Sequence, residues 1–242
     1  MKPRPEVSPE VSPEVRPQLR PQLRPQPRST DPRTASRPAP PARLRIIGGI
    51  WKRTPIPVPE VPGLRPTPDR VRETLFNWLG QDLTGWQCLD LFAGTGALGL
   101  EAASRGAAKV VLVEREPQAV SALQRLRERL HADTISIVQA EALGWLARCT
   151  QRFDLILLDP PFQSDALTRV LPTVLRVLAP GGMVYVESAQ PLAPDTPPLA
   201  QCPDLILHRA GKAGQVHYHL LLDTRTALPA SGAAPASPPS GA

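Results

Sequence analysis

The sequence is poor in cysteine and has no long apolar segment. Its 242 residues include three cysteines, and their positions, Cys88, Cys149 and Cys202, lack the spacing of metal ligands. An odd, scattered set of thiols is typical of the reducing cytosol. No apolar run reaches the roughly 18 residues that a membrane-spanning helix needs, and the first residues lack the apolar segment of a signal peptide. We therefore expect a cytoplasmic protein with no metal site and no membrane contact.

Proline, in contrast, is abundant, and many of the 32 prolines lie near the N-terminus. Residues 5–28 repeat a four-residue unit, PEVS, PEVS, PEVR, PQLR, PQLR, PQPR. A proline at every fourth position interrupts the hydrogen bonding of helices and sheets. We therefore expect residues 1–43 to form a disordered tail. Residues 226–242, rich in Ala, Pro and Ser, are expected to form a second one.

Positive charge is also concentrated towards the N-terminus. The net charge is +5 for residues 1–43, +3 for residues 44–80 and −2 for residues 81–242, within a formal total of +6. A basic arm beside a nearly neutral domain suits a polyanionic partner such as RNA. For residues 1–43 a solvated tail that only keeps the protein in solution is the alternative.

Residues 44–80 form a distinct block before the main domain, residues 81–225. The Gly48-Gly49 pair within residues 44–53 predicts a small hairpin. A helix is expected from Pro68, with Thr67 as its N-cap, because apolar side chains recur there on one helical face. The basic side chains of this block are candidates for RNA contact, and solvated arginines on an edge helix are the alternative. These candidates are Arg45, Lys52, Arg53, Arg65, Arg70 and Arg72.

An apolar run at residues 88–92, expected to be a buried strand, leads into a glycine-rich turn. Gly94, Gly96 and Gly99 have the spacing G-x-G-x-x-G, and a helix-forming segment follows. This order is typical of a cofactor site, because glycine lets a ligand approach the backbone beside a helix N-terminus. Asp90 suits the positive charges of S-adenosylmethionine and suits a dinucleotide pyrophosphate poorly. On the glycines alone, a dinucleotide site and a turn that binds nothing both remain open.

From residue 86 onward, expected strands and helices alternate. Such alternation predicts an α/β fold with a parallel, doubly wound sheet. The expected strands are 87–92, 109–114, 135–139, 153–158 and 182–187, and an antiparallel pair, 205–208 and 216–222, follows. The expected helices are 97–105, 117–131, 142–149 and 165–178, the last broken at Pro172.

Two further carboxylates are expected at the edge of the sheet where ligands bind. Glu114 ends an expected strand and can accept hydrogen bonds from ribose hydroxyls. Glu141 follows the next strand and can accept from an adenine amino group, cap the following helix, or do both.

The most specific motif is Asp159-Pro160-Pro161-Phe162, directly after the apolar strand 153–158. An aspartate that leaves a buried strand is costly unless it has a partner. The two prolines have no N–H, so the turn presents the carboxylate and carbonyl oxygens as acceptors. Such acceptors can hold the protons of an exocyclic amine and direct its lone pair, while Phe162 offers a face for base stacking. A merely structural turn is the alternative.

This motif resembles the (D/N/S)-P-P-(Y/F/W) signature of methyltransferases that act on exocyclic amines or amides. The wider pattern resembles the RsmD family of 16S ribosomal RNA guanine-N2 methyltransferases, over about residues 44–223. The segments that carry the resemblance are residues 45–49, 63–67, 69–79, 89–90, 92–94, 96–102, 159–162, 185–188 and 213–216. The proline repeat and the C-terminal tail do not belong to the family pattern.

The resemblance implies a Rossmann-like class I methyltransferase with a seven-stranded, mostly parallel sheet that ends in an antiparallel hairpin, and S-adenosylmethionine as methyl donor. It implies 16S rRNA as partner, free or within an assembling 30S subunit, and we expect a monomer. Asp159, Pro160 and Phe162 would hold the target guanine. The implied cofactor-binding residues are Asp90, Phe92, Ala93, Gly94, Gly96, Glu114 and Glu141.

Several other functions compete with this interpretation. A DNA adenine-N6 or cytosine-N4 methyltransferase shares the motif but usually carries a separate target-recognition region. A protein-glutamine methyltransferase typically has Asn in place of Asp159. An NAD-dependent dehydrogenase fits the glycines but leaves Asp90 and Asp159 unexplained, and a non-enzymatic RNA-binding module leaves both motifs without a role. No cysteine lies in a Pro-Cys loop, so covalent attack on a pyrimidine is not expected.

Overall fold

The computed structural model describes residues 44–61, 67–162 and 165–225. The expectations for the two tails and for Arg65 fall outside these residues. Within the described part of the chain, no helix has the length and apolar character needed to cross a membrane. The same residues contain no group of three or more His, Cys, Asp or Glu side chains placed to hold a metal ion.

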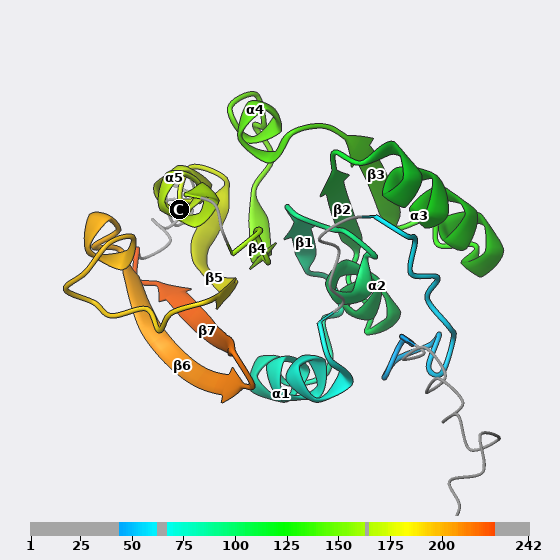
Figure 1. Cartoon of the computed structure of the whole chain (residues 1–242), viewed down its shortest axis with the longest axis horizontal. Helices are drawn as coiled ribbons and strands as arrows, with labels where there is room; N and C mark the ends of the chain where they lie inside the picture. The colour runs from blue at the N-terminus through cyan, green and yellow to red at the C-terminus, as the bar shows by residue number, and fades with distance from the viewer. Residues whose placement is uncertain (1–43, 62–66, 163–164, 226–242) are drawn as a thin grey trace, which may run out of the picture. The chain divides into compact units, whose positions relative to one another are not determined.

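The main domain is a seven-stranded sheet with the order β3-β2-β1-β4-β5-β7-β6 (Figure 1). Strands β1 to β5 run parallel, and β7 pairs antiparallel with both β5 and β6. This confirms the α/β class and the terminal antiparallel hairpin. The strands are β1 (Gln87–Asp90), β2 (Lys109–Glu114), β3 (Ile135–Gln139), β4 (Phe153–Leu158), β5 (Leu178–Ser188), β6 (Leu205–Ala213) and β7 (Val216–Asp223).

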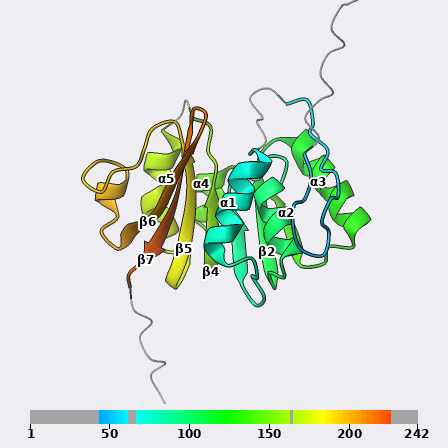
Figure 2. The ribbon, with the colours of Figure 1, turned by 90° about the horizontal axis from the view of Figure 1, so that it is seen from below.

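Helices cover both faces of the sheet (Figure 2). One buried apolar cluster contains side chains of α1, α2 and α3, and a second contains side chains of α4 and α5. The helices are α1 (Asp69–Leu79), α2 (Ala97–Ser104), α3 (Pro117–Leu130), α4 (Ala142–Leu146) and α5 (Ala166–Val174), with a short 3-10 turn, η1 (Leu199–Gln201).

The largest departure from the expected elements concerns α5 and β5. The helix continues through Pro172 and ends at Val174, and the strand begins at Leu178 instead of 182. Phe153 pairs with Leu178 and Leu155 with Met183, so β5 has extra residues opposite a short stretch of β4. A bulge of this kind, with Gly181 at a φ of 75°, lets the strand include a Pro-Gly-Gly segment that is typical of turns. Strand β1 and helix α4 are each shorter than expected at their carboxyl ends.

The N-terminal block reverses direction as expected, although it forms no regular strands. Backbone bonds join Ile46 N to Thr54 O at 2.9 Å and Arg53 N to Ile46 O at 2.8 Å. The expectation for Thr67 is wrong: α1 begins at Asp69, with Pro68 as N-cap and no side-chain cap. Because Pro68 is extended, with a ψ of 148°, the helix begins one residue later than expected, and the Thr67 hydroxyl donates to Asp159 after β4 instead.

Candidate active site

The candidate site lies where the order of the sheet changes direction. Strand β1 has β2 on one side and β4 on the other, so consecutive crossovers run in opposite directions from it. In open α/β sheets, ligands bind at the carboxyl ends of the strands at such a point. Asp90 ends β1, and Asp159 directly follows β4. Leu158 pairs with Val186 in β5, so Glu187 comes next to Asp159 at the same edge.

The glycine turn connects β1 to α2 at this edge. Gly94 and Gly96 have φ values of 52° and 77°, a region that favours glycine, and Gly96 is the N-cap of α2. A Cβ on Gly96 would lie 2.5 Å from the Leu123 side chain, and one on Gly99 would lie 2.2 Å from the Leu112 side chain. The glycines therefore allow both the turn and the close packing of α2 against β2 and α3.

Asp90 is buried beneath this turn, with an exposed fraction of 1%. Its Oδ2 accepts a hydrogen bond from the Gly99 N–H at 3.0 Å, which ties the end of β1 to the first turn of α2. Burial raises the pKa of Asp90 to about 7, and the nearby charges of Glu114 and Glu187 act in the same direction. The Asp90 carboxylate thus stabilises the glycine turn through this hydrogen bond. Among the described residues it has no cationic side chain as an ion-pair partner.

Asp159 and Glu187 add two more carboxylates beside Asp90. Burial, together with the charges of Glu187 and Asp90, raises the pKa of Asp159 well above its usual range. Burial also raises the pKa of Glu187, whose Oε1 accepts from the Tyr185 hydroxyl at 3.0 Å. Among the described residues, no lysine or arginine forms an ion pair with these three carboxylates. The cluster therefore favours a positively charged ligand, which would supply the missing countercharge.

The two other acidic candidates bind neighbouring backbone in this structure. Glu114 accepts from the Gly94 N–H at 2.7 Å and from the N–H groups of Arg115 and Glu116 at 2.8 Å each. Glu141 accepts from the Gly144 N–H at 2.7 Å, so the capping role considered for it is present. Both carboxylates lie at the carboxyl ends of β2 and β3, and neither arrangement removes all of their acceptor capacity.

The turn after β4 places an aromatic ring at the surface. Phe162 is 38% exposed, whereas Pro160 is buried. An exposed phenylalanine beside buried carboxylates provides a face for a planar ligand. Phe92 is half-buried and Ala93 is buried at the start of the glycine turn.

The basic candidates of the N-terminal block divide into two groups. Lys52, Arg53 and Arg70 are exposed, and Arg45 is exposed while it pairs with Asp69 at 3.3 Å. The prediction that Arg72 contacts RNA is contradicted, because its side chain is fully buried and pairs with Asp69 at 2.7 Å and Glu101 at 3.4 Å. A helix that packs on the domain must neutralise a buried cation internally.

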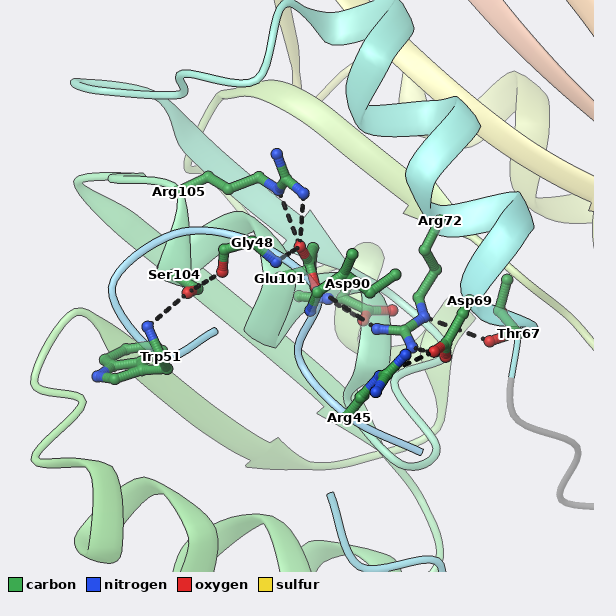
Figure 3. Close-up of polar contacts among 12 residues, drawn as sticks. Arg45, Gly48, Trp51, Thr67, Asp69, Arg72, Asp90, Glu101, Ser104 and Arg105 are labelled. Carbon is green, nitrogen blue, oxygen red and sulfur yellow. Dashed lines mark hydrogen bonds and ion pairs between the residues drawn. The ribbon is translucent and has the colours of Figure 1, made fainter. Parts of the chain in front are cut away.

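Sequence reasoning missed the residues that attach this block to the domain (Figure 3). Glu101, fully buried in α2, accepts from the N–H groups of Ile47 and Gly48 at 2.7 Å each. One turn later, the Ser104 hydroxyl donates to the Gly48 carbonyl at 2.6 Å and accepts from the Trp51 N–H at 3.0 Å. A glutamate inside the otherwise small and apolar segment ALGLEAAS was the available signal, because a buried carboxylate needs partners.

The comparisons with known proteins agree with this geometry. The family model described as Conserved hypothetical protein 95 matches residues 44–222. The Escherichia coli K12 protein named Ribosomal RNA small subunit methyltransferase D is 42% identical over 180 residues, which are 74% of this chain and 89% of that protein. The protein of the same name from Buchnera aphidicola subsp. Baizongia pistaciae is 32% identical over 184 residues, 74% of this chain and 92% of that protein. The solved structure of the putative methyltransferase yhhF from Escherichia coli has 40% identity and a TM-score of 0.66, and the match covers 77% of this chain and 99% of that chain.

Proposed function

Because the chain belongs to the RsmD family, we propose that it transfers a methyl group from S-adenosylmethionine to the exocyclic N2 amine of a guanine in 16S ribosomal RNA. The observation that carries the proposal is the position of Asp159-Pro160-Pro161-Phe162. This turn follows β4 at the sheet edge where the glycine turn follows β1. An acceptor turn for an amine and a cradle for a methyl donor thus lie on adjacent strands.

The residues at the glycine turn fit the proposed methyl donor. S-adenosylmethionine carries an electrophilic methyl group on a sulfonium and also bears an ammonium group. The buried carboxylates Asp90 and Glu187 offer the negative charge that such a cation needs, and the half-buried Asp159 lies beside them. Gly94 and Gly96 would hold the methionine end with Asp90, Phe92 and Ala93. Glu114 would accept from the ribose and Glu141 from the adenine.

Asp159 has two tasks in the proposed transfer. Its carboxylate and the Pro160 carbonyl accept hydrogen bonds from the two protons of the guanine amine, while Phe162 stacks against the base after the base leaves its helix. A cationic ligand beside Asp159 lowers the pKa of this carboxyl and keeps it ionised near neutral pH. As the new N–C bond forms and the S–C bond breaks, Asp159 takes up the amine proton and passes it to water.

The RNA contacts are proposed for the exposed part of the N-terminal block. Arg45, Lys52, Arg53 and Arg70 are the described basic side chains that can reach phosphates, and Arg65 remains a candidate from the sequence. We further propose that the protein acts as a monomer in the cytoplasm, on rRNA that is free or within an assembling 30S subunit.

The test is a methyl-transfer assay with radiolabelled S-adenosylmethionine and four acceptors: naked rRNA, 30S particles, DNA and protein. After nucleoside digestion, the label is expected in N2-methylguanosine from rRNA. Asp159→Ala should reduce the single-turnover rate roughly a hundred- to a thousand-fold, with a smaller loss for Asp159→Asn and little change in cofactor affinity. Label in methylated adenine or cytosine of DNA would instead support a DNA amine methyltransferase. Transfer by Asp159→Ala within a few-fold of wild type would contradict the role of this turn.

A further inference from the structure

The hydroxyl of Thr67 lies against the acidic cluster, although Thr67 belongs to the N-terminal block. Its Oγ1 donates to Asp159 Oδ2 at 3.4 Å, and the residue is 5% exposed. This hydrogen bond favours the ionised form of Asp159 and so opposes the effect of burial on the pKa of that carboxyl. Thr67 therefore supplies an uncharged hydrogen-bond donor to the carboxylate that follows β4, although Thr67 itself is not part of the sheet. A long contact of this kind is common at catalytic carboxylates before substrate binds.

The backbone of Thr67 is held by Arg72. Arg72 Nε donates to the Thr67 carbonyl at 3.3 Å, its Nη2 lies 2.7 Å from Asp69 Oδ1, and its Nη1 lies 3.4 Å from Glu101 Oε2 (Figure 3). The planar guanidinium has donors in fixed directions, so these three contacts together define the position of Thr67 relative to α1 and α2.

Glu101 extends the network to the start of the described chain. It accepts from the backbone of Ile47 and Gly48, and its Oε1 lies 2.7 Å from Arg105 Nη2. A continuous series of polar contacts therefore runs from the loop at residues 46–54, through Glu101 and Arg72, to Thr67 and Asp159. Glu101 and Arg72 are both fully buried, so solvent does not weaken this connection.

We propose that Thr67 is a positioning residue for the Asp159 carboxylate, and that the buried Arg72–Glu101 pair holds Thr67 in place. The proposal rests on the proposed methyl transfer and deepens it, because it makes the N-terminal block part of the active site and not only an RNA-contacting surface. Asp159 faces Asp90 from β1, Glu187 and Tyr185 from β5, and Thr67 from the segment before α1.

The chemistry of the cluster explains why a hydroxyl suits this place. A lysine or arginine beside Asp159 would occupy the carboxylate in an ion pair and lower its basicity further, so that it would take up the amine proton less readily. A hydroxyl donates one hydrogen bond, favours the ionised carboxylate and leaves the other oxygen for the amine. Orientation of the carboxylate matters because a small misplacement of a reacting group lowers the rate of transfer.

The test compares Thr67→Val, which removes the hydroxyl at nearly constant volume, with Thr67→Ser, which keeps it. Thr74→Val is the matched control, because the Thr74 hydroxyl donates only to the Arg70 carbonyl within exposed α1 surface. The first readout is the titration of the Asp159 carboxyl by carbon-13 NMR in the ligand-free protein. The second is the pH profile of single-turnover transfer to rRNA, measured with the melting temperature of each variant.

We expect Thr67→Val to raise the pKa of Asp159, to move the pH profile to higher pH and to lower the rate roughly ten-fold. Thr67→Ser and Thr74→Val should resemble wild type in both readouts. If Thr67→Val does not fold, Thr67→Ala removes the same hydroxyl without placing a methyl group beside the carboxylates. An unchanged titration and rate in the hydroxyl-free variant would overturn the proposal. Absence of transfer by wild type would overturn the proposed function, whereas the NMR titration would still report on Thr67.

Discussion

The Arg72 guanidinium lies 3.4 Å from the Glu101 carboxylate, and both side chains are fully buried. This pair joins α1 of the N-terminal block to α2, the helix that begins at the glycine turn. Burial lowers the pKa of Arg72, while the charges of Glu101 and Asp69 raise it, so the cation depends on these partners. The block is therefore attached to the domain by an internal ion pair as well as by apolar contacts.

Removal of Arg72 should destabilise the protein. Arg72→Met leaves the Glu101 carboxylate buried, and loss of one partner of a buried pair costs about 3 kcal/mol or more. Arg105 still neutralises part of the Glu101 charge, so we expect the lower end of this range. Chemical denaturation measures the effect. Arg70→Met is the matched control on the exposed side of the same helix, and it should weaken rRNA binding while stability stays nearly constant. Equal stability of the two variants would contradict the assigned role of Arg72.

Substitution of Gly49 should detach the N-terminal loop. Gly49 has a φ of 71°, and a Cβ there would lie 1.8 Å from the backbone oxygen of Ser104, which accepts from the Ile50 N–H. Gly49→Ala should therefore displace the loop, raise amide hydrogen exchange at Trp51 and weaken rRNA binding. Gly80→Ala is the control, because Gly80 has a φ of 93° but no atom within 4 Å of the added Cβ. Exchange at Trp51 that is unchanged in Gly49→Ala would contradict the clash with Ser104, and Gly80→Ala should leave this exchange as in wild type.

Cofactor binding should strengthen as the pH rises through about 7, the pKa of Asp90 in the ligand-free protein. Below this pH the carboxyl is protonated and offers no charge to a cation, so binding must release a proton. Affinity should fall several-fold from about pH 7.5 to about pH 6, because one pKa unit corresponds to a factor of ten. Calorimetry in buffers of different ionisation enthalpy measures the released protons.

Asp90→Asn keeps an acceptor for the Gly99 N–H and should weaken binding and release fewer protons than wild type, while Asp159 and Glu187 still titrate in the same cluster. Binding without proton release would count against Asp90 as a cofactor residue.

Phe162→Ala should impair transfer to rRNA without affecting the fold. Phe162 is 38% exposed, so its loss removes little core packing, whereas stacking of a base on an aromatic ring contributes roughly 1–3 kcal/mol. We expect a roughly ten- to hundred-fold loss in kcat/KM for rRNA and an unchanged melting temperature. Ile206→Ala is the control, because Ile206 is an exposed apolar residue in β6, at the far edge of the sheet. A parallel loss of cofactor affinity in Phe162→Ala would point to a role other than base stacking.

Periodicity and the glycine and proline motifs were sufficient to predict the order of strands and helices. Local patterns succeeded for β2, β3 and β4, whose apolar runs have clear ends. They were wrong at the start of β5, because its Pro-Gly-Gly segment has the composition of a turn. Pairing with β4 places this segment in the strand, and that pairing cannot be read from the local sequence. The roles of Thr67 and Arg72 were also missed, since a threonine before Pro68 fits an N-cap and an arginine in an amphipathic helix fits a surface position.

The sequence by itself determined the fold class and the two motifs at the sheet edge, because period, glycine spacing and proline positions depend only on neighbouring residues. Tertiary structure decided which charges are buried. Arg72 is far in the sequence from Glu101, and Glu187 is far from Asp159. Only the packing of α1 on α2 and the pairing of β4 with β5 bring these pairs together. Burial and charge proximity, which set the pKa values of Asp90 and Asp159, are properties of that arrangement and not of any local segment.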